Sequence, residues 1–77
     1  MENLLDEIAE IIAPIAECDI ADVTPDVNLP NTLGVDSLRG LEIMVMIERK
    51  FKVKLSEERL QEMTTPKRIA NMITEQL

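Results

Sequence analysis

The chain of 77 residues is long enough for one domain, residues 1–77, because a second hydrophobic core could not be filled from so short a sequence. Its 15 acidic and 8 basic residues give a net charge of −7, and Phe51 is the single aromatic residue. Nucleic acids and anionic membranes are poor partners for such a chain. No apolar run approaches the roughly 18 residues of a membrane span, and the first residues lack the features of a targeting peptide. We therefore expect a cytoplasmic protein without membrane insertion.

The absence of histidine and the presence of one cysteine, Cys18, disfavour most enzymatic and metal-binding chemistry. Histidine is the usual general base and the commonest zinc ligand, and one cysteine cannot form an intrachain disulfide. The sequence also has no glycine-rich phosphate loop and no nucleophile paired with a base. We therefore expect a protein that is not an enzyme and holds no metal ion, with Cys18 as a small, mostly apolar loop residue.

The first predicted helix begins after Asn3, a good N-cap residue, because apolar residues recur at steps of three and four from Leu4 onward. Pro14 lacks an amide and disfavours the helical conformation at Ala13, so we expect the helix to stop or kink near Pro14. Residues 19–35 carry Pro, Asn and Gly among irregularly spaced aliphatic residues. This segment is predicted to be a long loop that packs over the core.

A second helix is predicted from Ser37 to Lys50, because its apolar residues share one face when placed at about 100° per residue. The members of this inner face are Gly40, Ile43, Met44, Ile47 and Phe51. The opposite face holds Leu38, Glu42, Val45 and Arg49. Two aliphatic residues on an outer face are either ordinary surface residues or part of a docking surface.

Two further helices complete the predicted fold. Ser56 can cap a short helix over residues 57–62. Thr65 followed by proline begins a last helix whose Ile69, Met72 and Ile73 turn inward. No strand alternation or internal repeat is present. The predicted fold class is all-α: a small four-helix bundle, with three longer helices and one short third helix, and a long first loop.

The segment Leu-Gly-Val-Asp-Ser-Leu at residues 33–38 is the one site candidate. Taken alone, Asp36 and Ser37 are capping residues at a helix start. The surrounding sequence adds the length, the acidity, the order of elements, the run from Glu42 to Phe51 and the paired threonines before the last helix. With these features, the chain resembles the acyl carrier protein family over nearly its whole length.

The resemblance implies a cofactor and a set of partners. In that family the serine of the DSL motif carries a covalent 4′-phosphopantetheine arm, and here that serine is Ser37. Asp36 would help a phosphopantetheinyl transferase to hold magnesium and coenzyme A. A phosphodiester on Ser37 would lie where free helix amides favour an anion. The protein, a monomer, would then present thioester intermediates to acyl-transferring and chain-elongating enzymes of fatty acid, lipid or polyketide synthesis.

The resemblance also implies a docking surface and an acyl pocket. The partner-binding residues would be Leu38, Arg39, Glu42, Val45 and Arg49. An acyl chain would enter between the second and third helices, among Leu29, Leu33, Ile47, Leu55, Leu60, Met63 and Ile69. Ordinary core packing is the alternative role for each residue of this pocket.

Basic residues on the second helix set this chain apart from carriers of housekeeping fatty acid synthesis, which usually present acids there. This helix carries Arg39, Arg49 and Lys50, and the family's divalent-cation positions are largely lost. The pathway therefore stays open between housekeeping synthesis and a specialised bacterial carrier for lipid A acyl groups, a polyketide or another lipid. Two alternatives are a peptidyl or D-alanyl carrier and an apo protein-interaction module on the same fold.

Overall fold

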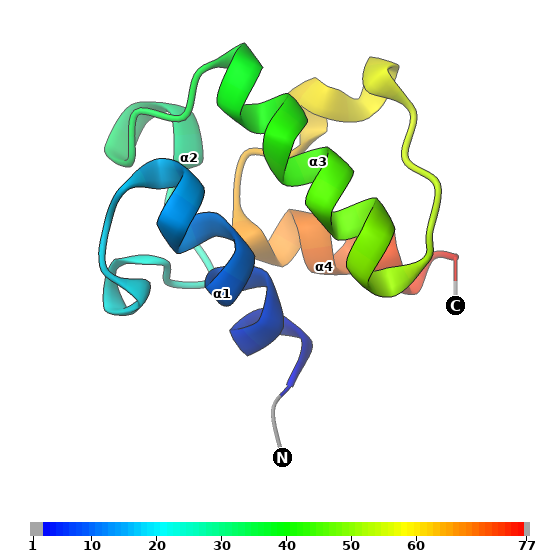
Figure 1. The fold of residues 1–77 in the computed structure, drawn as a ribbon, viewed down its shortest axis with the longest axis horizontal. Coiled ribbons are helices and arrows are strands. Elements are labelled where there is room, and N and C mark those ends of the chain that lie inside the picture. Colours follow the sequence, from blue (N-terminus) through cyan, green and yellow to red (C-terminus); the bar gives the residue numbers. More distant parts are fainter. Residues whose placement is uncertain (1–2, 77) are drawn as a thin grey trace.

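The computed structural model describes residues 3–76, which form helices and connecting loops without a strand. The elements are α1 (Leu4–Ala16), the 3₁₀ helix η1 (Ile20–Asp22), α2 (Leu29–Thr32), α3 (Ser37–Phe51), the 3₁₀ helix η2 (Glu57–Glu62) and α4 (Pro66–Thr74). Helix α1 packs against both α3 and α4 (Figure 1). No helix in this range has the length and apolar character to cross a membrane. The predicted all-α bundle is confirmed.

The helices begin at the predicted capping residues. Asn3 Oδ1 accepts a hydrogen bond from the Asp6 amide at 2.9 Å, and Thr65 Oγ1 accepts one from the Arg68 amide at 3.2 Å. Each cap satisfies an amide that has no partner inside its helix. The short third helix also begins as predicted, because Ser56 Oγ accepts from the Glu58 amide at 3.2 Å.

Helix α1 includes Pro14 in its last turn and ends at Ala16, so it stops near the proline, as expected. In the last turn a proline removes only one internal hydrogen bond, and the side chains of Ala13 and Ala16 are buried in the core. Beyond them the chain turns back at Glu17, which has a positive φ of 57°. The amides of Glu17 and Cys18 then donate to the carbonyls of Pro14 and Ala13, at 3.3 and 3.1 Å.

The segment between α1 and α3 packs over the core, as predicted, but it is not a continuous loop. It contains η1 and α2, and Asn28 Oδ1 caps α2 by accepting from the Asn31 amide at 2.9 Å. Val23, Leu29 and Val35 of this segment are buried. The Leu29 amide also donates to the Thr64 carbonyl at 2.9 Å. This bond ties the segment to the start of α4.

Three pairs of isoleucines form the centre of the core. Within each pair the residues lie one turn apart, so both project from the same side of their helix. The pairs are Ile8 and Ile12 in α1, Ile43 and Ile47 in α3, and Ile69 and Ile73 in α4, all 0% exposed. Full burial of one such side chain contributes about 1.5–3 kcal/mol. The predicted inner faces of α3 and α4 are therefore confirmed at these positions.

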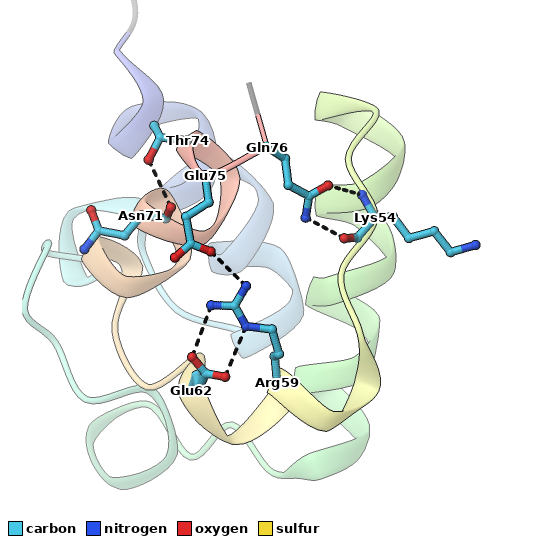
Figure 2. Close-up of polar contacts among 7 residues, drawn as sticks. All are labelled: Lys54, Arg59, Glu62, Asn71, Thr74, Glu75 and Gln76. Atoms are coloured by element: carbon cyan, nitrogen blue, oxygen red, sulfur yellow. Dashed lines mark hydrogen bonds and ion pairs between the residues drawn. The ribbon is translucent and has the colours of Figure 1, made fainter.

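Polar contacts attach η2 and the loop before it to α4 (Figure 2). Arg59 bonds Glu62 at 3.1 and 3.2 Å and Glu75, just beyond α4, at 2.9 Å. The Gln76 amide group bonds both the amide and the carbonyl of Lys54. The hydrogen bonds between Arg59 and Glu62 raise the pKa of the Arg59 guanidinium and lower the pKa of the Glu62 carboxyl group. Such exposed pairs add little stability, but they fix where η2 lies relative to α4.

Candidate functional site

Ser37 is the first residue of α3, and its side chain is exposed. The preceding residue, Asp36, caps the helix: its Oδ1 accepts from the Arg39 amide at 2.9 Å and its carbonyl accepts from the Gly40 amide at 2.8 Å. Within residues 3–76, no hydrogen bond engages the Ser37 hydroxyl. The sequence predicted capping roles for both residues, and the structure places that role on Asp36. Ser37 is left with an exposed hydroxyl on a fixed backbone.

The turn before Ser37 is formed by Gly34 and held by Val35. Gly34 adopts a positive φ of 66°, a conformation that glycine adopts without steric cost. The adjacent Val35 is buried, and its amide donates to the Leu29 carbonyl at 3.0 Å. Because Val35 is buried and bonded to Leu29, the core fixes the chain just before α3 begins.

A cavity of about 410 Å³ lies beside Ser37, between α3, α2 and η2. Its lining includes the apolar residues Leu29, Val35, Ile43, Leu60 and Met63 and the exposed carboxylates Asp36, Glu57 and Glu58. Gly40 also lines it, and a Cβ added there would lie 3.2 Å from Leu60 Cδ1. The missing side chain therefore lets Leu60 of η2 approach α3 closely.

Three of the seven residues that the resemblance assigns to an acyl pocket line this cavity. Leu29, Leu60 and Met63 line it. The other four residues of that set, Leu33, Ile47, Leu55 and Ile69, do not line it. Ile47 lies one turn beyond Ile43, further from Ser37, and is fully enclosed by the core. Gly40, Ile43 and Val35 were not assigned to the pocket, although the helical spacing of Gly40 and Ile43 after Ser37 could have indicated them.

The proposed partner-binding residues lie on the outer side of α3. Leu38 is 68% exposed and Val45 is 45% exposed, and Glu42 and Arg49 are also exposed. The predicted outer face is therefore confirmed as a surface. Arg39 is half-buried, because its Nη2 pairs with Glu17 Oε2 at 3.0 Å.

Cys18 lies just beyond α1 and is half-buried against the core. Partial burial and the carboxylates of Asp22 and Asp19 raise the pKa of its thiol. A raised thiol pKa lowers the fraction of reactive thiolate at neutral pH. The structure therefore favours a packing role for Cys18 over a chemical one.

The cap at Asp36 leads to a stability prediction. Asp36→Ala removes the acceptor of the Arg39 amide and should lower the free energy of unfolding by about 1 kcal/mol. Asp36→Asn keeps an acceptor oxygen in the same place, so its stability should stay within about 0.5 kcal/mol of wild type. Urea denaturation followed by circular dichroism measures both. Equal losses in the two variants would mean that charge, and not capping, is what Asp36 contributes.

Comparison with known proteins gives the family. A family model described as "Phosphopantetheine attachment site" matches residues 6–73. The chain belongs to the acyl carrier protein family. It is 33% identical to polyketide-8 synthase acyl carrier protein 2 of Streptomyces avermitilis over 72 residues. This matched region is 94% of this chain and 83% of that relative. It is 36% identical over 72 residues to an acyl carrier protein of Thermobifida fusca, with 94% and 91% coverage.

A third relative shows the range of carriers that this chain matches. The acyl carrier protein AcpXL of Mesorhizobium japonicum is 37% identical over 59 residues, which is 77% of this chain and 63% of that relative. Members of the family are carriers and not catalysts, and their cofactor is 4′-phosphopantetheine. The exposed serine hydroxyl and the adjoining apolar cavity suit this role, since such a carrier supplies position and the cofactor supplies the reactive group.

Proposed function

We propose that Ser37 is the residue of this carrier to which the 4′-phosphopantetheine arm is attached. The observation that carries the proposal is the exposed Ser37 hydroxyl at the start of α3, fixed by the Asp36 cap and next to an apolar cavity. A phosphodiester there would lie at the positive end of the helix dipole, where negative charge is stabilised by about 0.3–1 kcal/mol. The bound arm supplies a thiol that holds the acyl group as a thioester.

The cavity beside Ser37 fits an aliphatic group. Its buried lining is apolar, and the missing side chain at Gly40 leaves space next to α3. We propose that Leu29, Leu60 and Met63 contact the arm or its cargo, with the unbranched Met63 side chain adapting to the occupant. A longer acyl chain would have to part η2 from α3 before it reached Leu33, Ile47, Leu55 or Ile69.

The proposed partners act at the same end of α3. They are a phosphopantetheinyl transferase, which loads Ser37, and the acyl-transferring and chain-elongating enzymes that use the loaded carrier. The carrier itself would be a monomer in the cytoplasm. The cap uses Oδ1 of Asp36, and the second oxygen would help the transferase to hold magnesium. Leu38, Glu42 and Val45 would meet these enzymes, with Arg39 and Arg49 beside them. The relatives' names favour an acyl cargo, such as a polyketide intermediate, over a peptidyl or D-alanyl one.

Loading of the wild-type protein tests the proposal. Incubation with coenzyme A, magnesium and a promiscuous transferase should add the mass of one phosphopantetheine, and fragmentation should place it on Ser37. Asp36→Asn, which keeps the helix cap, should load more slowly because it lacks the carboxylate charge. A wild-type protein that several transferases leave unmodified would contradict the proposal and favour the apo interaction module. The acyl group found on protein from its native cell then separates the kinds of carrier.

A further inference from the structure

The mouth of the cavity beside Ser37, meaning the exposed part of its lining, is acidic, although the buried lining is apolar. Three of the exposed lining residues are carboxylates: Asp36 just before α3, and Glu57 and Glu58 at the start of η2. Among the described residues, no Lys or Arg lines the cavity. Its other polar lining residues are uncharged: Ser37, Gln61 and Thr64. A group that enters therefore passes carboxylates and meets no cation.

The cations nearest in sequence to these three carboxylates are paired with other acids. Arg39 gives Asp36 only its backbone amide, and Arg59 directly follows Glu58. The guanidinium groups of both arginines pair with acids that do not line the cavity: Glu17 with Arg39 at 3.0 Å, and Glu62 and Glu75 with Arg59 at 3.1 and 2.9 Å (Figure 2). No ion pair within residues 3–76 includes a carboxylate of the mouth. Their negative charges are therefore not neutralised by the protein.

Glu57 and Glu58 are held beside the cavity by the way η2 is built. Ser56 Oγ caps this 3₁₀ helix by accepting from the Glu58 amide at 3.2 Å. Leu60, in the same 3₁₀ helix, lies so close to α3 that a Cβ added at Gly40 would be 3.2 Å from its Cδ1. The two acids therefore belong to the element that closes one side of the cavity.

A carboxylate at the end of an acyl group would meet two costs in this cavity. Its charge would lose hydration among the apolar side chains of the buried lining. It would also be repelled by the three carboxylates of the mouth, because like charges raise the energy of the occupied state. An uncharged aliphatic group meets neither cost, and it gains free energy when its apolar surface is buried.

We propose that this cavity selects uncharged aliphatic acyl groups over acyl groups that end in a carboxylate, with Glu57 and Glu58 as specificity-determining residues. The inference rests on the proposed role of the cavity as a site for the cargo. An uncharged chain would turn back into the cavity, whereas a chain that ends in a carboxylate would stay in solvent, within reach of partner enzymes. The charge at the far end of the cargo would then decide where it lies.

Chemical tethering tests this selection without a transferase. Ser37→Cys in a Cys18→Ser background leaves one thiol, at a position that lines the cavity. Pentyl and 4-carboxybutyl methanethiosulfonate attach chains of equal carbon number to this thiol through a disulfide, and methyl methanethiosulfonate gives the reference protein. A chain that fills the cavity stabilises the folded state. The melting temperature at pH 7, followed by circular dichroism, therefore reports whether each chain occupies the cavity.

We expect the pentyl chain to raise the melting temperature by about 4 °C or more above the methyl reference, and the 4-carboxybutyl chain to raise it by less than half as much. Adding Glu57→Gln and Glu58→Gln should narrow this difference by at least half, because both local charges are removed. Asp26→Asn with Glu42→Gln is the matched control, since it removes the same total charge from exposed acids that do not line the cavity. The control should leave the difference unchanged.

Several results would overturn the proposal. Equal shifts for the two chains would show that the cavity does not select by charge, and no shift with either chain would show that it takes no cargo. A difference that Glu57→Gln with Glu58→Gln leaves unchanged, or that the control narrows equally, would show that these two acids do not determine the selection. A wild-type protein that transferases fail to load would contradict attachment at Ser37 and not this selection, because the tether needs no transferase.

Discussion

Ser37→Ala should fold as the wild type does and should gain no mass when it is incubated with coenzyme A, magnesium and a transferase. Its free energy of unfolding should stay within about 0.5 kcal/mol of the wild-type value, the usual range for an exposed site. The structure gives the reason, because Asp36 and not Ser37 makes the capping hydrogen bond of α3. In the proposed attachment, however, the Ser37 oxygen is the nucleophile: it attacks the phosphorus next to the pantetheine of coenzyme A, the pyrophosphate bond breaks, and adenosine 3′,5′-bisphosphate leaves.

Ser56→Ala is the matched control, since Ser37 and Ser56 are the only serines in the chain. Ser56 is also exposed, but its hydroxyl caps η2 by accepting from the Glu58 amide. This variant should lose up to about 1 kcal/mol of stability and still gain one phosphopantetheine. The two serines therefore have opposite expected outcomes. A modified Ser37→Ala protein would show that the attachment site lies elsewhere.

The start and end of α3 could be predicted from sequence because local interactions decide them. Its start follows from a capping side chain at Asp36, and the observed end at Phe51 is one residue beyond the predicted one. The outer face was predictable for the same reason: helical spacing alone separates Leu38 and Val45 from the buried side. At these positions the local pattern and the tertiary packing agree.

Local rules were less exact where packing decides the conformation. Pro14 predicts a stop or kink nearby but not the last helical residue, and burial of the last turn of α1 keeps the chain helical through Ala16. Helix α2 has only four residues, too few for a periodic pattern. Its position depends on the bond between Leu29 and Thr64, which are far apart in the sequence.

The sequence allowed us to predict the candidate residue, Ser37, but not the cavity beside it. Ser37 stands out in the sequence through its motif, whereas the cavity beside it depends on how closely η2 approaches α3. That distance depends on the missing side chain at Gly40, where an added Cβ would lie 3.2 Å from Leu60 Cδ1. A second depression, lined by Ile11 and Ile15 of α1 and by Met46 of α3, was missed for a similar reason. It exists only because α1 packs against α3, and the sequence of either helix alone does not show it.

The boundary between pocket and core leads to the prediction with the largest effect on stability. Ile47→Ala should lower the free energy of unfolding by about 2–5 kcal/mol, because it removes a fully buried side chain and leaves a void among packed neighbours. A domain of this size has a total stability of about 4–12 kcal/mol. The variant should therefore unfold at a much lower urea concentration, measured by circular dichroism.

Ile20→Ala provides the control with the same chemical change at a side chain that is 52% exposed, and its loss should be about 0.5 kcal/mol. A similar small loss for Ile47→Ala would mean that Ile47 faces a space able to collapse or to admit a ligand, as the family resemblance implied. A large loss places Ile47 in the structural core, one turn beyond Ile43, the last residue of α3 that lines the cavity. In that case the depth of the cavity is limited by α3 itself, and cargo longer than the space beside Gly40 must displace η2.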